Sequence, residues 1–241
     1  MRKFYEEKEI LFAVLWIIAY CVILAPVLDA YGDGSLIHLI VLAVFALAIF
    51  AFVKTNHLEA KYGIDRWPHP TRPYLYFIPM WILSTGNLWG GIRMNYSGMS
   101  VVYAVVSMFL VGFAEEMIFR GFLFQGMLAD GNKTLAIVIV SLTFGIGHII
   151  NLFTGQTTLE TFVQVPFAIA WGFIFTMVAY KSKSLLPCIL AHGLVDACCV
   201  FAASNPIADW IYVISTIVVS VVYCMHLSRL KENGPNTDPL P

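Results

Sequence analysis

Charged residues are scarce in this sequence. Asp, Glu, Lys and Arg make up 12% of the 241 residues, whereas 59% are hydrophobic. A soluble domain carries about twice that share of charge, so the composition excludes an ordinary soluble protein and indicates an integral membrane protein. The net charge of −1 gives no sign of a strongly acidic or basic partner, and we expect no nucleic-acid partner.

Several familiar motifs are also missing. The five cysteines show no CxxC spacing, which argues against a disulfide or metal framework. There is no HExxH zinc motif, and no serine or cysteine has an obvious base, Ser141 and Cys188 included. No internal repeat is evident, which disfavours a transporter built from inverted repeats.

Long apolar runs are abundant instead. A membrane-spanning helix needs about 17–25 mostly apolar residues. We therefore predict an all-α polytopic membrane protein with about eight transmembrane helices, at residues 9–28, 35–53, 74–89, 98–128, 133–151, 161–180, 185–203 and 207–227.

The basic residues predict the orientation, because cytoplasmic loops carry an excess of Lys and Arg. With the N-terminus inside, all Lys and Arg fall on the cytoplasmic side except Arg93 outside and Arg120 within the membrane. Both termini are then cytoplasmic. We expect a scaffold of helices 1–3 in residues 1–97, a functional core of helices 4–7 in residues 98–203, and a last helix with a polar tail in residues 204–241.

Three charges interrupt the fourth predicted span. Glu115, Glu116 and Arg120 lie in an otherwise apolar segment, and each charge at membrane depth costs roughly 2.5 kcal/mol or more. Glu116 and Arg120 are four residues apart and can form an ion pair on one helix face. Glu115 points about 100° away and is a candidate general base. The alternative is that both glutamates merely neutralise Arg120.

A histidine follows in the fifth span, within the sequence Phe144-Gly145-Ile146-Gly147-His148. The two glycines allow a neighbouring helix or a substrate to approach closely. Asn151 shares a face with His148 and is a candidate to fix its tautomer. Taken alone, His148 is better interpreted as a satisfied core residue.

The seventh span contributes His192 and Asp196, again four residues apart. The aspartate can orient the imidazole or, when protonated, donate a hydrogen bond; the alternative is a pair that only ties helices together. A rise of about 1.5 Å per residue places Glu115, His148 and His192 at overlapping depths in three helices. We therefore predict that these groups meet at one buried site that activates water.

The three motifs together resemble a known family. EExxxR at Glu115, FxxxH at Phe144 and HxxxD at His192 occur in order in separate hydrophobic helices, as in the CPBP intramembrane proteases. That family includes the CAAX prenyl endopeptidases and bacterial proteins of the bacteriocin-processing and abortive-infection types. The resemblance covers about residues 98–203.

The resemblance implies an all-helical intramembrane endopeptidase of the glutamate type. Glu115 and His148 would activate the water, His192 and Asp196 would stabilise the oxyanion, and Glu116 and Arg120 would hold the site together. The prenyl-protease branch has asparagine where this chain has Asp196, and an ionised carboxylate cannot donate to an oxyanion. Here Asp196 would therefore act by orienting His192.

Two alternatives remain open from the sequence. Glu115, His148 and His192 are ligand types found in catalytic zinc sites, so a zinc protease is a minority alternative to a cofactor-free enzyme. A non-catalytic immunity or scaffold protein, or a proton pathway, could use the same polar groups. We expect a multi-pass protein of a bacterial plasma membrane that acts on a membrane-associated or lipidated protein or peptide.

Overall fold

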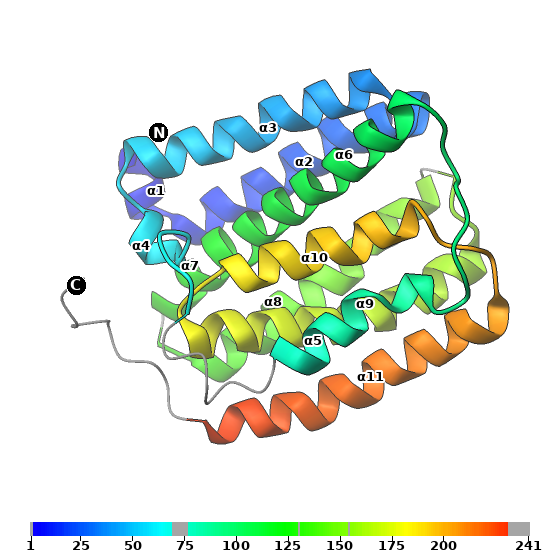
Figure 1. Cartoon of the computed structure of the whole chain (residues 1–241). Coiled ribbons are helices and arrows are strands. Elements are labelled where there is room, and N and C mark those ends of the chain that lie inside the picture. The colour runs from blue at the N-terminus through cyan, green and yellow to red at the C-terminus, as the bar shows by residue number, and fades with distance from the viewer. Residues whose placement is uncertain (1, 69–76, 130, 154, 231–241) are drawn as a thin grey trace, which may run out of the picture.

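The computed structural model is a bundle of helices that run roughly side by side (Figure 1). It describes residues 2–68, 77–129, 131–153 and 155–230. No strand occurs within these ranges, only an isolated β-bridge between Ile92 and Ala202. The helices are α1 Arg2–Glu7, α2 Glu9–Tyr31, α3 Leu36–Thr55, α4 Glu59–Tyr62, α5 Phe77–Ser84, η1 Gly86–Leu88, α6 Met99–Glu116, η2 Met117–Leu123, α7 Phe124–Ala129, α8 Lys133–Gly147, η3 His148–Phe153, α9 Thr158–Ser182, α10 Leu186–Cys199 and α11 Pro206–Arg229.

The predicted all-α membrane architecture is confirmed, whereas the count of eight spans is not. In the described part of the chain, six helical segments are long and apolar enough to cross a membrane: α2, α3, α6 through α7, α8 with η3, α9 and α11. The third predicted span contains the eight residues of α5, and its first residues, 74–76, lie outside the described ranges, as does the predicted tail after residue 230.

The seventh predicted span is also shorter than expected. Helix α10 has 14 residues, about 21 Å of helix, against a hydrocarbon core of about 30 Å. Most of its residues are buried against neighbouring helices, which reduces its need to match the hydrocarbon thickness. Backbone hydrogen bonds fix both flanks: Leu185 N donates to Gly63 O, and Arg93 N donates to Phe201 O.

Helix α6 changes its winding directly after the paired glutamates. Residues Met117–Leu123 form a π-helix, and all seven are buried; α7 then continues to Ala129. Such wide turns are frequent at functional sites because they re-aim side chains within a helix. The sequence pattern predicted an uninterrupted α-helix here.

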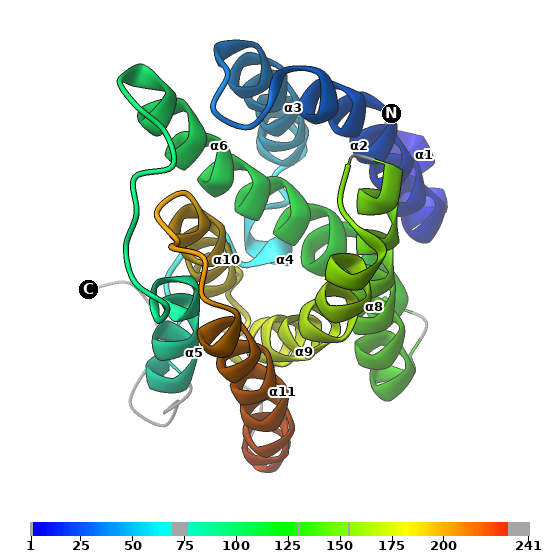
Figure 2. The same ribbon diagram turned by 90° about the vertical axis from the view of Figure 1, so that its right-hand side faces the viewer.

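Glycines bring α6 and α10 into close contact, and the two helices lie side by side (Figures 1 and 2). A Cβ on Gly112 would come within 2.6 Å of the Gly193 backbone nitrogen, and one on Gly193 within 3.0 Å of Phe109 Cα. Small residues permit this approach of helix backbones. Gly112 lies one turn before Glu116 and Gly193 follows His192, so the contact sets these two side chains against each other.

A second close contact joins α8 to α9. A Cβ on Gly145 would come within 2.6 Å of Ile169 N, which confirms the predicted close approach at this glycine. Gly147 has open space instead, and the residue lies in the wall of a cavity. The α8–α9 pair thereby brings His148 to the same region as α6 and α10.

Candidate active site

Glu116 is the centre of a buried ionic cluster. Its Oε1 accepts from Arg120 Nη1 at 2.8 Å and from His192 Nδ1 at 2.9 Å. The side chains of Glu116 and Arg120 are both 0% exposed. The predicted ion pair on one helix face is present, and it also holds a histidine from α10, which lies 76 positions away in sequence.

Arg120 has further partners on α9. Its Nε donates to Thr176 Oγ1 and its Nη2 to the Gly172 carbonyl, both at 3.3 Å. The guanidinium also lies over the Phe144 ring, 4.1 Å from its centroid, an arrangement that stabilises a cation. A buried charge is tolerated when it is paired and hydrogen-bonded, and these contacts meet that condition.

His192 presents its other ring nitrogen to two carboxylates. Nε2 lies 3.4 Å from Asp196 Oδ2 and 3.8 Å from Glu115 Oε2. The imidazole is stacked on Phe175, with ring centroids 5.5 Å apart, and meets the edge of Phe144. Because Glu116 and the two aromatic rings fix the imidazole, Nε2 keeps a defined direction.

His148 begins η3, directly after α8. Its Nδ1 lies 3.0 Å from the Phe144 carbonyl, so this nitrogen donates and Nε2 remains for other contacts. The sequence suggested Asn151 for fixing the ring. In the structure the contact to Nδ1 comes from the Phe144 carbonyl, and the Asn151 amide donates to Gln164 Oε1 at 2.8 Å.

A cavity of about 320 Å³ joins the predicted groups. Glu115, His148, His192 and Asp196 all line it, although they come from three separate helical segments. Glu115 and Asp196 are partly exposed, with 15% and 26% of their side-chain surfaces accessible. Glu115 therefore faces the cavity, while its neighbour Glu116 lies buried behind it.

The sequence interpretation missed four polar residues in the cavity wall. They are Tyr20 on α2, His38 on α3, Thr143 on α8 and Gln164 on α9. The Tyr20 side chain also interacts with the Glu115 carboxylate. Single polar residues in apolar helices carry no spacing signal, and two of these lie in the N-terminal helices that were expected to act as scaffold.

Within the described residues, no three His, Cys, Asp or Glu side chains are grouped as a metal site requires. The cluster around Glu116 is instead built as hydrogen-bonded ion pairs between carboxylates, an imidazole and a guanidinium.

The fold and the cluster together define a polytopic membrane protein with a carboxylate–histidine site between its helices. The family of type II CAAX prenyl endopeptidases, Rce1-like, matches residues 97–198. Residues 97–198 thus form an Rce1-like domain, consistent with a CPBP family protease, within a membrane-helical protein. Comparisons with curated proteins and with solved structures gave no match.

Proposed function

We propose that this chain is an intramembrane glutamic endopeptidase that hydrolyses a peptide bond in a membrane-associated or lipidated protein or peptide. The observation that supports this most is the shared cavity, in which Glu115, His148, His192 and Asp196 converge from three helical segments. The Rce1-like domain covers all four residues.

The first step is the activation of water. Glu115 accepts a proton from a water molecule that His148 positions through Nε2, and the water oxygen attacks the scissile carbonyl carbon. A carboxylate in a partly desolvated cavity can act as such a base. No covalent bond to the enzyme forms.

The second step is stabilisation of the tetrahedral intermediate. His192, protonated at Nε2, donates to the oxyanion, and Asp196 holds that N–H in place until the oxyanion develops. Donors aimed at developing charge are worth most where water is restricted. The intermediate collapses as the C–N bond breaks, and Glu115 passes its proton to the leaving amine.

Glu116 and Arg120 are positioning residues in this scheme. Glu116 keeps Nδ1 of His192 protonated and fixes the direction of the ring, while Arg120 neutralises Glu116 and attaches it to α9. Neither residue lines the cavity in the described part of the chain.

Replacement of Glu115 by Gln tests the proposed reaction. The amide keeps the shape of the side chain but cannot accept the proton, so cleavage should fall by about a hundredfold or more. Quantitative proteomics of membranes from cells with either form should reveal uncut precursors in the Glu115→Gln cells alone. Glu7→Gln, at an exposed acidic residue, is the matched control. A biological effect that persists in Glu115→Gln cells would instead indicate a non-catalytic immunity or scaffold role.

We also propose that no metal takes part in the reaction. Cleavage by the purified protein should then survive exhaustive chelation, and metal analysis should find less than one equivalent bound. Loss of activity on chelation, with recovery on addition of zinc, would favour the zinc alternative with Glu115, His148 and His192 as ligands.

For the membrane topology we propose eight passes with both termini in the cytoplasm, in the plasma membrane of a bacterium. The contacts at both flanks of α10 support a full pass by this short helix. The basic residues support the orientation because they gather at one end of the bundle.

A further inference from the structure

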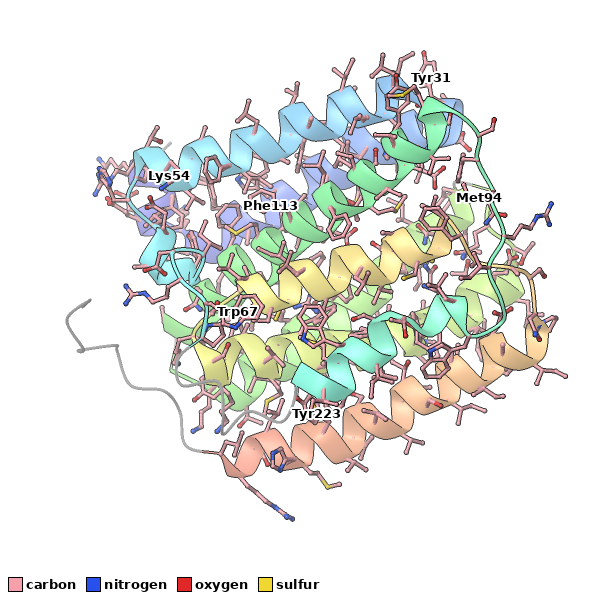
Figure 3. The ribbon with its side chains drawn as sticks, viewed as in Figure 1. Tyr31, Lys54, Trp67, Met94, Phe113 and Tyr223 are labelled. Atoms are coloured by element: carbon pink, nitrogen blue, oxygen red, sulfur yellow. The ribbon has the colours of Figure 1, made fainter. Side chains whose placement is uncertain are left out.

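The two ends of the helix bundle carry different charges. We call one the lysine-rich end; it contains the starts of α2 and α8 and the ends of α3, α9 and α11. Its described basic residues are Arg2, Lys3, Lys8, Lys54, Lys61, Arg66, Lys133, Lys181, Lys183 and Arg229. Lys54 and Trp67 mark this end, and Tyr31 and Met94 mark the opposite one (Figure 3).

The opposite, lysine-poor end has Arg93 as its one basic residue in the described ranges. Its acidic residues are Asp29, Asp33, Glu160 and Asp209. An asymmetry of this size predicts that the lysine-rich end is cytoplasmic and the lysine-poor end is not.

The cavity extends toward the lysine-poor end. Its wall includes Leu28 in the last turn of α2, His38 in the first turn of α3, and Ile150 and Asn151 in η3. Helix α2 ends and α3 begins at that end (Figure 1), and η3 continues α8 away from the lysine-rich end. Asp196, one turn from the end of α10, belongs to the same part of the wall.

The opposite side of the site is closed by packed side chains. Ile118 and Phe119 form the floor of the cavity and are 0% and 8% exposed. Both residues belong to η2, and the rest of that segment is buried as well, Arg120 included. Protein interiors packed in this way leave few voids larger than a water molecule, so among the described residues this layer separates Glu115 from the lysine-rich end.

Exposure changes across the site in the same direction. The side chain of Glu116 is 0% exposed, that of His192 8% and that of Asp196 26%. Farther along, Leu28 is 38% exposed and Gly147 is also exposed, although both belong to the cavity wall. The cavity wall thus continues between α2 and α8 toward the lysine-poor end.

We propose that the substrate reaches the site from the extracytoplasmic face. The substrate would be a membrane-inserted polypeptide whose scissile bond lies in the outer half of the bilayer or next to it. The wall offers aliphatic side chains from α2, together with His38, a buried residue whose Nδ1 has no hydrogen-bond partner among the described residues. The inference rests on the proposed proteolytic function, to which it adds the face of the membrane from which the substrate enters.

Labelling of introduced cysteines tests the direction of access without any substrate. In a cysteine-free variant that retains cleavage, Leu28→Cys and Ile150→Cys report on the cavity, and Lys54→Cys reports on the lysine-rich end. A membrane-impermeant maleimide should label the first two in intact cells, and Lys54→Cys only in inverted vesicles. Labelling of both cavity positions only in inverted vesicles would overturn the proposal. This readout does not depend on Glu115, so it can fail while Glu115→Gln still abolishes cleavage.

Obstruction of the cavity gives a second test, in a protein that keeps its five native cysteines. Leu28→Trp places a bulky ring in the wall, whereas Val22→Trp places the same ring on the same helix at a position that is 67% exposed and outside the wall. Cleavage of the precursors that accumulate in Glu115→Gln cells should slow severalfold in Leu28→Trp, through a higher KM, and stay unchanged in Val22→Trp. Equal rates in both variants, or scissile bonds that map to the cytoplasmic side of the precursors, would contradict access from outside.

Discussion

The two sides of the His192 ring differ in almost every physical respect. On the Nδ1 side, Glu116 and Arg120 are fully buried and joined by short hydrogen bonds. On the Nε2 side, Glu115 and Asp196 are partly exposed and lie 3.4–3.8 Å away. The first side resembles a structural core, and the second resembles a site kept available for a ligand.

This difference separates stability from chemistry within one cluster of charges. Groups that are paired with an opposite charge and have no solvent contact contribute through the geometry that they impose. Groups that line a cavity, such as Glu115 beside Tyr20, can exchange their contacts for those of a substrate. Substitutions on the Nδ1 side should therefore change folding and turnover together, and substitutions on the Nε2 side should change turnover alone.

Substitution of Glu116 by Gln should have the largest effect on stability. The amide keeps the volume of the side chain but leaves the Arg120 charge buried without a counter-ion, which costs about 3–5 kcal/mol. The apparent melting temperature in detergent should fall sharply, and cleavage should fall with it because His192 loses its anchor. Glu115→Gln is the comparison, since it removes the adjacent carboxylate on the cavity side. Its melting temperature should be close to that of the unaltered protein. Equal stability of the two variants would contradict the division between the two sides.

An extra methyl group between α6 and α10 should have an intermediate effect. In Gly193→Ala the new Cβ would meet Phe109 at 3.0 Å from Cα and 2.4 Å from Cδ1. Overpacking of this kind costs about 1–3 kcal/mol, and the separation of the helices would weaken the bond from His192 to Glu116. Thermal unfolding and cleavage assays should both report the loss. Gly147→Ala is the stability control, because a Cβ there has open space. A similar loss of stability in that variant would show that the loss in Gly193→Ala does not arise from the α6–α10 contact.

The sequence was informative where two groups share one helix. The pairing of Glu116 with Arg120 follows from helical geometry alone, and the same geometry turns Glu115 toward the cavity. The close approach at Gly145 was also predictable, since small residues mark helix contacts in membranes.

Contacts between helices were less predictable. The bond from His192 to Glu116 depends on how α6 and α10 are rotated against each other, and apolar residues on all sides of a membrane helix hide that rotation. The same reason explains why the contributions of Tyr20 and His38 to the cavity were missed. The short length of α10 went unnoticed because a buried helix and a lipid-spanning helix have similar hydropathy.

Replacement of Asp196 by Asn should have the smallest effect. It tests whether the carboxylate charge on the cavity side of His192 is needed for cleavage. Asp196 Oδ2 lies 3.4 Å from His192 Nε2, where a negative charge competes with the oxyanion for the same donor. The amide has a donor of its own, so Asp196→Asn should cleave within about fivefold of the unaltered rate, since one such hydrogen bond is worth roughly 1 kcal/mol. Asp196→Leu removes both functions and should be slower, with unfolding unchanged in either variant. If Asp196→Asn were as inactive as Glu115→Gln, the carboxylate itself would be required, and Asp196 would have to take a proton during the reaction.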